Sequence, residues 1–237
     1  MSPSFFYEKG LWKRGFNVVA GADEVGRGCF AGSVVAAVVA FGKNTVFEDK
    51  IFSSKGRRIA INDSKKLTFK QREISASWIR KNCLVWGAGE VGVGVINRVG
   101  IAKATQMAFR KAVVNASRKL AIDYLLIDAF YIPYVRGFPS VRRQARQRSW
   151  NDPKSRQIAI INGDEKSYSI AAASIIAKVY RDRLMQNLGS KPRYRRYGWE
   201  TNKGYGTKLH RQAIKKYGIT KYHRKAFVES FLKNRSA

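Results

Sequence analysis

Acidic residues are scarce in this sequence. There are 16 Asp plus Glu against 46 Lys plus Arg, which gives a formal net charge of +30. The basic residues extend from Lys9 to Lys233, so the charge is not a tail attached to a neutral domain. Because a surface this basic repels itself, we expect a polyanionic partner such as a nucleic acid. A membrane partner is not expected, since no segment combines an apolar face with a long basic border.

Cysteines and long apolar segments are also few. Cys29 and Cys83 are the only cysteines, and their spacing is not that of metal ligands, so we expect a reducing compartment and no disulfide. The longest apolar run, residues 30–41, is too short to span a bilayer. Glu8 and Lys9 interrupt the segment where a signal peptide needs an apolar core. These features predict a soluble, cytoplasmic protein.

The 237 residues, 45% of them apolar, are enough for one domain with a substantial core. Apolar periodicity and turn residues predict strands at 18–25, 33–41, 83–91, 124–127 and 157–161 and helices at 69–81, 96–120, 165–188, 207–217 and 223–233. Residues 42–61 are predicted to form a polar surface loop. This order predicts an α/β fold, with a sheet domain over 1–188 and a basic, Tyr-rich helical extension over 189–237.

Local patterns support three of these helices. Thr68 and Gln71 have the spacing of a capping box at the start of helix 69–81. Alanine recurs every four residues from Ala104 to Ala116, which allows that helix to lie close to a sheet. Residues 169–179, SIAAASIIAKV, are apolar nearly all round, so we expect this segment to be buried.

The rest of the chain is organised around residues 18–28, VVAGADEVGRG. The segment has the β-branched, apolar start of a buried strand and then two adjacent carboxylates, Asp23 and Glu24. Buried carboxylates are costly unless a cation neutralises them. Gly26 and Gly28 allow the backbone a positive φ or a close approach to a ligand. Solvated acids before an ordinary turn are the simpler explanation for this pair taken by itself.

Two further acidic residues also stand where a predicted strand ends. Asp128 follows the predicted strand 124–127, and Asp164 follows 157–161. Asp128 could be a solvated turn residue and Asp164 a helix N-cap. Three strands that deliver carboxylates to one edge of a sheet, however, require a cation, because like charges a few ångströms apart cannot all ionise. Such oxygen ligands suit Mg²⁺ or Mn²⁺ and, in a basic protein, metal-assisted attack on a phosphodiester.

The sequence resembles the ribonuclease HII family. The resemblance is carried by GADEVGRG (21–28), AG-VVAA (31–37 without Ser33), NDSKKLT (62–68), LLID (125–128), NGDEKSYSIAAASIIAKVYRD (162–182) and NKGYGTKLH (202–210). The motifs occur in this order over most of residues 15–228. The resemblance implies a ribonuclease H-like mixed five-stranded sheet flanked by helices, with a small helical C-terminal extension. It also implies cleavage of the RNA strand of RNA–DNA hybrids and nicking 5′ of single ribonucleotides in duplex DNA.

The resemblance assigns site residues by motif position. It implies four catalytic carboxylates that bind two Mg²⁺ or Mn²⁺ ions: Asp23, Glu24, Asp128 and Asp164. It implies contacts to the ribose 2′-hydroxyl from Gly26, Arg27, Gly28 and Tyr205. It places near the substrate phosphates Lys65, Lys66, Ser174 and Lys178. Lys65 and Lys66 could instead be a solvated helix start, and Ser174 could bond back within its helix.

Several residues are left open or depart from the family pattern. We expect Asp182 to tie its helix to a neighbour, whereas His210 fits a place near the site and a structural role equally well. Cys29 and Ser33 stand where many members have proline. Residues 136–156 form an insertion with seven Lys/Arg and one acid, which either follows a nucleic-acid backbone or is passive. Residues 191–225 interleave twelve Lys/Arg with aromatic rings, a composition that suits duplex contact.

Two other functions are weighed against this one. Another nuclease or an integrase on the same sheet would explain the acids but not the GRG turn together with Tyr205. A non-catalytic basic RNA- or DNA-binding protein would explain the charge but not the four placed carboxylates. The sister family ribonuclease HIII is disfavoured, since only 22 residues precede Asp23 and an extra N-terminal domain would not fit. We expect the protein to act as a monomer.

Overall fold

The computed structural model describes residues 2–45, 47, 59–129, 131–135 and 156–233. Its centre is a five-stranded sheet in the order β3-β2-β1-β4-β5. The strands are β1 (Val19–Val25), β2 (Val34–Ala40), β3 (Val85–Val91), β4 (Tyr124–Asp128) and β5 (Gln157–Ile160). The pairs β1–β2 and β2–β3 are antiparallel, and the pairs β1–β4 and β4–β5 are parallel. The predicted mixed five-stranded sheet is confirmed.

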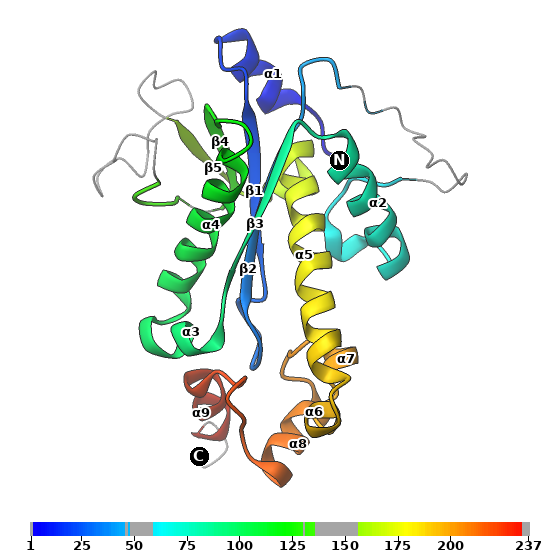
Figure 1. Cartoon of the computed structure of the whole chain (residues 1–237), viewed down its shortest axis with the longest axis vertical. Helices are drawn as coiled ribbons and strands as arrows, with labels where there is room; N and C mark the ends of the chain where they lie inside the picture. Colours follow the sequence, from blue (N-terminus) through cyan, green and yellow to red (C-terminus); the bar gives the residue numbers. More distant parts are fainter. Residues whose placement is uncertain (1, 46, 48–58, 130, 136–155, 234–237) are drawn as a thin grey trace.

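Helices cover both faces of the sheet (Figure 1). One face packs against α4 (Ile101–Ser117) and the other against α5 (Tyr168–Gly189). Outside α5 lies α2 (Phe69–Asn82), and α1 (Phe6–Lys13) lies near the start of β1. Each face has its own cluster of buried apolar side chains. Burial on both faces explains why β2 is apolar along its whole length, with every residue buried.

Two of the predicted local patterns determine how these helices sit. Thr68 and Gln71 form the expected capping box at the start of α2. The alanines of α4 lie over Gly87 and Gly89 of β3, where an added Cβ would overlap the backbone carbonyls of α4. Small residues on both surfaces therefore let this helix approach the sheet more closely than larger side chains would.

Two helix predictions were wrong in their limits. The predicted helix 96–120 is two helices, α3 (Val93–Val99) and α4, because Gly100 between them has a φ of 79°. The predicted helix 165–188 begins at Tyr168, with Ser167 as its N-cap. Asp164 is therefore not the N-cap of this helix and lies in a preceding 3₁₀ turn, η3 (Gly163–Glu165). The helix α1 was not predicted.

The C-terminal residues form a small helical unit. Its helices are α6 (Pro192–Arg195), α7 (Trp199–Asn202), α8 (Lys208–Tyr217) and α9 (Lys225–Lys233). The last two match the predictions, whereas the one-turn helices α6 and α7 were not predicted. The unit packs its own apolar cluster around the fully buried Trp199, with Met185 of α5 as a member. It lies below the β1–β2 turn and the C-terminal end of α5 in Figure 1.

Two predicted loops lie largely or wholly outside the described residues. These are the basic insertion, of which only Arg156 is described, and most of the connection 42–61. Within the described part of the chain, no helix is both long and apolar enough to cross a membrane.

Candidate active site

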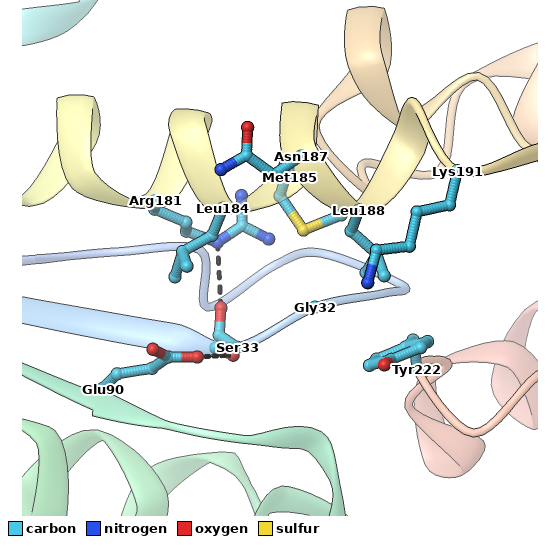
Figure 2. A pocket seen from close by; sticks show the side chains of 10 residues that line it. All are labelled: Gly32, Ser33, Glu90, Arg181, Leu184, Met185, Asn187, Leu188, Lys191 and Tyr222. Atoms are coloured by element: carbon cyan, nitrogen blue, oxygen red, sulfur yellow. Dashed lines mark hydrogen bonds between the residues drawn. The ribbon is translucent and has the colours of Figure 1, made fainter. Parts of the chain in front are cut away.

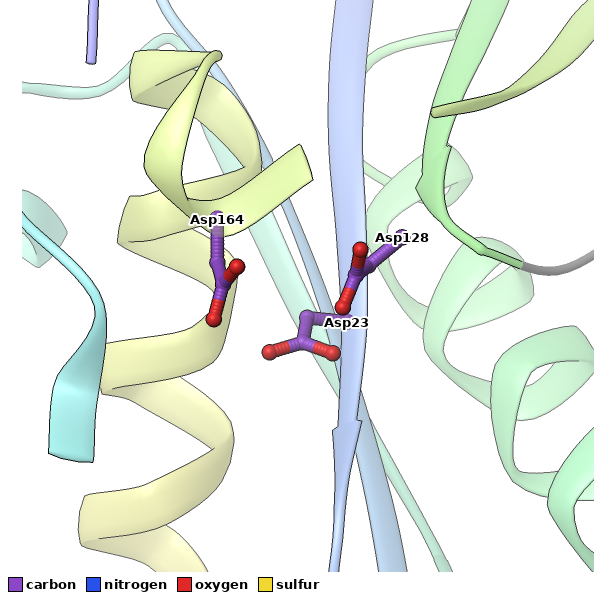
Figure 3. A group of neighbouring side chains, drawn as sticks. All are labelled: Asp23, Asp128 and Asp164. Carbon is purple, nitrogen blue, oxygen red and sulfur yellow. The ribbon is translucent and has the colours of Figure 1, made fainter. Parts of the chain in front are cut away.

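Three aspartates from three segments meet beside β1. Asp23 lies in β1, Asp128 is the last residue of the neighbouring parallel strand β4, and Asp164 lies in η3 after β5. Ala22 pairs with Ile127, so Asp23 and Asp128 are at the same level of the sheet. Each offers one carboxylate oxygen, and these oxygens lie within 4.8 Å of one another. In Figure 3 the three side chains point toward one another between β1 and α5.

Backbone hydrogen bonds hold this arrangement. The N–H of Gly163 donates to Asp128 Oδ1 at 2.8 Å, which ties η3 to the end of β4. Asn162 reaches this turn through the left-handed conformation, with a φ of 54°. The N–H of Glu24 donates to Asp23 Oδ1 at 2.7 Å. The carboxylates of Asp23 and Asp128 are therefore oriented by the main chain.

The cluster is electrostatically unfavourable without a cation. Burial, the charge of Glu24 and the charge of Asp128 raise the pKa of Asp23 well above its ordinary value. Burial, followed by the charge of Asp128, raises the pKa of Asp164 to about 6. Lys65 Nζ is 3.9 Å from Asp164 Oδ2, but its side chain is 81% exposed and its charge is screened by water. Buried oxygen ligands of like charge fit a hard divalent cation.

Glu24 lies beside this trio but is not among the three carboxylates within ligand distance of one another. Its Oε1 is 3.5 Å from Arg27 Nη1, and its Oε2 is buried without a hydrogen-bond partner in the described structure. Burial raises the pKa of Glu24 above its ordinary value, and the positive charge of Arg27 offsets only part of this rise. A buried carboxylate oxygen without a partner is costly unless a ligand binds it. The expected four-acid set is thus present as three clustered aspartates and one adjacent glutamate.

The two glycines of the GRG turn differ. Gly26 has a φ of 91°, and an added Cβ would overlap the side chain of Arg181. Gly28 has neither a positive φ nor any atom within 4 Å of an added Cβ. Of the two roles expected for these glycines, a positive φ is found at Gly26, and Gly28 leaves room for a close approach to the backbone. Space over Gly28 remains open to a ligand.

Two buried arginines shape this turn, and neither was recognised from the sequence. Arg224 donates to the carbonyls of Arg27 at 2.7 Å and Gly32 at 2.8 Å. Arg181 of α5 donates to the carbonyls of Ser33, Ala31 and Lys203. Both side chains are fully buried. One signal for Arg181 was present in the sequence, since this charged residue follows closely on the segment 169–179 that was predicted to be buried.

Tyr205 lies next to the turn, as expected. The carbonyl of Gly204 accepts hydrogen bonds from the N–H groups of Phe30 and Ala31, which join the two loops. The ring of Tyr205 is 6.0 Å from Lys178 Nζ and 6.0 Å from Arg181 Cζ, and the residue is 41% exposed. The tyrosine is therefore available to a substrate that lies against the turn.

The predicted phosphate-binding residues lie along one side of the aspartates. Lys65 and Lys66 are in a 3₁₀ turn, η1 (Ser64–Lys66), and Lys66 Nζ is 2.5 Å from Glu165 Oε1. The Ser174 hydroxyl donates to Ser64 Oγ at 2.9 Å, so it does not simply bond back within its own helix. It also lies within reach of Asp23, where it offsets part of the rise in the pKa of that carboxyl group.

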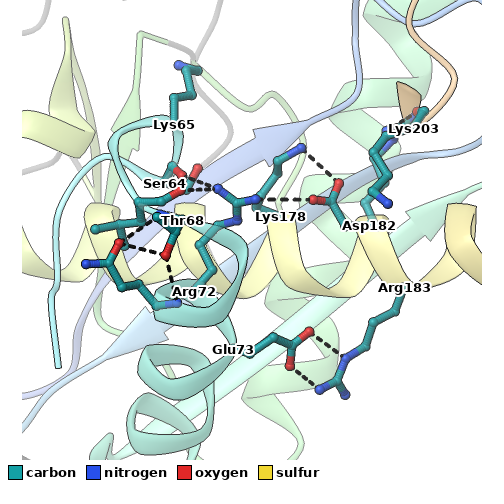
Figure 4. Close-up of polar contacts among 12 residues, drawn as sticks. Ser64, Lys65, Thr68, Arg72, Glu73, Lys178, Asp182, Arg183 and Lys203 are labelled. Atoms are coloured by element: carbon teal, nitrogen blue, oxygen red, sulfur yellow. Dashed lines mark hydrogen bonds and ion pairs between the residues drawn. The ribbon is translucent and has the colours of Figure 1, made fainter. Parts of the chain in front are cut away.

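Lys178 is held by Asp182. The Lys178 ammonium is 2.8 Å from Asp182 Oδ1, and Arg72 of α2 is 3.8 Å from Asp182 Oδ2 (Figure 4). The expectation that Asp182 ties α5 to a neighbour is confirmed. His210 is buried and hydrogen-bonded to Trp199 and His223, so its surroundings are structural.

A separate pocket of about 230 Å³ lies between α5, the β1–β2 turn and the C-terminal unit (Figure 2). Leu184, Met185 and Leu188 supply its apolar wall. Ser33 donates to Glu90 Oε1 at 2.5 Å at its edge. The aspartates do not line this pocket, so it is distinct from the carboxylate cluster.

Comparison with known proteins agrees with this geometry. The family model for ribonuclease HII matches residues 20–231. A ribonuclease HII from Caldanaerobacter subterraneus subsp. tengcongensis is 41% identical over 228 residues, which cover 96% of this chain and 81% of that protein.

Solved structures share the fold. Ribonuclease H2 from Pyrococcus horikoshii OT3 matches with a TM-score of 0.65 and 26% identity, covering 92% of this chain and all of that one. Bst ribonuclease HIII in complex with Mn²⁺ matches with a TM-score of 0.61 and 18% identity, covering 92% of this chain and 71% of that one. The last likeness concerns the fold only. With the family model over nearly its whole length and close relatives of the same kind, the chain belongs to the ribonuclease HII family.

Proposed function

We propose that this protein cleaves the RNA strand of RNA–DNA hybrids and nicks duplex DNA 5′ of a single embedded ribonucleotide. Membership of the ribonuclease HII family supports the reaction class. The observation that carries the proposal is the convergence of Asp23, Asp128 and Asp164 beside the GRG turn and Tyr205. This arrangement supplies both a place for phosphodiester hydrolysis and a place to recognise a ribose.

The four acids are proposed as the catalytic and metal-binding set. Asp23, Asp128 and Asp164 would share one divalent ion, and Glu24 would offer its unpartnered Oε2 to a second. When bound, two Mg²⁺ or Mn²⁺ ions would activate water and stabilise the leaving 3′-oxygen, giving 5′-phosphate and 3′-hydroxyl ends. Asp23 and Asp128 would be ready to bind metal before substrate arrives, because backbone hydrogen bonds already orient their carboxylates.

Recognition of the 2′-hydroxyl is proposed for Gly26, Arg27 and Gly28 together with Tyr205. The open space over Gly28 lets a ribose approach the backbone, and the Tyr205 hydroxyl offers a second polar contact. A site built to hydrogen-bond a hydroxyl rejects the analogue that lacks it by roughly 10⁴–10⁵, because its polar groups are then left unpaired.

Phosphate binding is proposed for Lys65, Lys66, Ser174 and Lys178, which border the carboxylates on one side. The remaining positive charge would add contacts to the duplex backbone that do not depend on sequence. We further propose that the chain acts as a monomer with two parts, 1–188 and 189–237. The apolar cluster around Trp199 is formed mainly by the second part and joins it to Ala31 and Met185 of the first.

The test is cleavage of a DNA duplex with one ribonucleotide in Mg²⁺, Mn²⁺ or EDTA. We expect a single nick 5′ of the ribonucleotide with either metal, none in EDTA, and none in the all-DNA duplex. The Asp23→Asn variant should bind the duplex without cleaving it. Binding without metal-dependent cleavage by the wild-type protein would instead support a non-catalytic nucleic-acid-binding protein.

A further inference from the structure

The protein has only two histidines, and they form one buried pair behind Tyr205. His210 belongs to α8, and His223 lies between α8 and α9. Both side chains are buried, and their Nε2 atoms are 3.2 Å apart. Trp199 donates its indole N–H to His210 Nε2 at 3.0 Å. None of these groups reaches the aspartates, so catalysis at the carboxylates leaves them unexplained.

The partners of the pair determine which nitrogen carries each proton. His210 Nδ1 is 2.8 Å from the carbonyl oxygen of Tyr205, which can only accept, so His210 is protonated at Nδ1. His223 Nδ1 accepts the backbone N–H of Thr220 at 2.8 Å, so His223 carries its proton on Nε2. The Nε2–H of His223 therefore donates to His210 Nε2.

This chain of hydrogen bonds runs in one direction from the C-terminal segment to Tyr205. It passes from the N–H of Thr220 through His223 and His210 to the Tyr205 carbonyl. A proton added at His210 Nε2 would face two donors, so the pair is stable only when both rings are neutral. Burial lowers the pKa of His210, and burial together with His210 lowers the pKa of His223 to about 4.

The pair ends at the backbone of the residue proposed to read the ribose. The Tyr205 carbonyl accepts from His210 Nδ1–H and also from the N–H of Thr207 at 2.8 Å, which uses both of its lone pairs. On the other side of Tyr205, Gly204 is bonded to the β1–β2 turn. The main chain of Tyr205 is thus held on both sides while its ring remains available to substrate.

We propose that His210 is a positioning residue for Tyr205, with its ring held in place by His223, and that this pair sustains the discrimination between a ribonucleotide and a deoxynucleotide. The proposal rests on the proposed role of Tyr205. If the pair only packs the C-terminal unit, its loss should affect the stability of the protein and its affinity for every duplex. If the pair positions Tyr205, its loss should selectively reduce the affinity for the duplex that contains a ribonucleotide.

Two substitutions of His210 separate these roles. In His210→Asn the amide nitrogen lies near the place of Nδ1 and can still donate to the Tyr205 carbonyl. In His210→Gln the amide lies near the place of Nε2, so the contact with Trp199 can remain while the donor to Tyr205 is lost. Each change is made in the Asp23→Asn background, where duplexes bind without being cut.

The measurement is the ratio of dissociation constants for an all-DNA duplex and the same duplex with one ribonucleotide, in Mg²⁺. We expect His210→Gln to lower this ratio by about tenfold, as for one lost buried hydrogen bond, and His210→Asn by less than about threefold. Affinity for the all-DNA duplex should not change. Equal effects of the two variants, or a parallel loss of all-DNA affinity, would overturn the proposal.

A double-mutant cycle with Tyr205→Ala tests whether the effect passes through Tyr205. If it does, His210→Gln should change the ratio by less than about twofold once Tyr205 is absent. An unchanged effect in that background would overturn the positioning role. If Tyr205→Ala has no effect on the ratio, the role of Tyr205 in the proposed function fails and this inference falls with it. If Tyr205→Ala matters and His210→Gln does not, only the inference fails.

Thermal melting checks that each variant is folded. Should His210→Gln not fold, His223→Leu gives a second test, because it removes one of the two donors that hold the His210 ring in place through Nε2. His223→Leu should then lower the ratio, and His223→Gln, which retains a donor near Nε2, should preserve it. An unchanged ratio in His223→Leu would count against the proposal.

Discussion

The guanidinium of Arg224 donates to the backbone carbonyl of Arg27 at 2.7 Å, across 197 residues of sequence. The same side chain holds the Gly32 carbonyl through Nε and Nη2. Arg224 is fully buried, and no carboxylate lies within ion-pair distance of it among the described residues. In this endoribonuclease the C-terminal unit therefore helps to shape the GRG turn as well as covering the core next to it.

Replacing Arg224 by lysine should destabilise the protein although the charge is kept. A lysine ammonium cannot reproduce the planar fork of donors, so buried carbonyls of the turn lose partners. Each unsatisfied buried acceptor costs about 1–3 kcal/mol, and we expect a loss of about 2–4 kcal/mol in the free energy of unfolding, measured in urea. Arg118→Lys, on the exposed end of α4, is the matched control and should change little. Equal stability of the two variants would contradict this account.

The two glycines of the turn should respond differently to alanine. Gly26→Ala introduces a strained φ and a clash with the fixed Arg181 side chain, so we expect a large loss of thermal stability and of activity. Gly28→Ala meets nothing in the protein and should keep the melting temperature of the wild type. Reduced cleavage by this stable variant would then show that the substrate must come close to the backbone at Gly28. Full activity of Gly28→Ala would remove that contact from the proposal.

The carboxylate cluster should make the metal-free protein less stable as the pH rises. The pKa of Asp164 is raised from 3.8 to about 6, first by burial and then by Asp128. A group with a raised folded pKa stabilises the native state below its unfolded pKa, and this contribution is lost as the pH rises through the folded value. Between about pH 4 and 6, the wild type should therefore lose up to about 3 kcal/mol relative to Asp164→Asn.

Urea unfolding in EDTA at several pH values measures this difference. Excess Mg²⁺ or Mn²⁺ at pH 7 should restore stability to the wild type and much less to Asp164→Asn. Glu229→Gln, an acid-to-amide change on the exposed side of α9, serves as the control. If the free energy of unfolding of the wild type and of Asp164→Asn changed in parallel with pH, ionisation of Asp164 would not destabilise the metal-free protein.

The neighbouring lysines of η1 should contribute unequally to duplex binding. Lys65 is largely exposed beside Asp164, whereas Lys66 already pairs with Glu165 at 2.5 Å. We expect Lys65→Gln to reduce the slope of log K against log[salt] by about 1, and Lys66→Gln by about half of that or less, because its ion pair must first break. Fluorescence anisotropy over a salt series measures both slopes. Equal slopes would mean that the two lysines contact phosphates alike.

The sequence by itself determined the sheet, the family and the order of the acids. Runs such as residues 33–41 are short, apolar and rich in valine, which favours a buried strand, and the structure has a strand in each predicted place. Because Asp128 and Asp164 follow strand ends, they had to reach the same edge as Asp23 once the strands became parallel neighbours. These properties depend on local composition and on chain order.

Only the tertiary structure determined where the individual side chains of the site lie and which groups they contact. Strand periodicity could not show that Glu24 would stand apart from the three aspartates, and the GRG motif could not show that only Gly26 has a backbone conformation that requires glycine. The Arg224–Arg27 bond and the histidine pair join segments that no local pattern connects. Such contacts depend on which polar groups remain unpaired after the core has packed, and packing brings them together from distant parts of the chain.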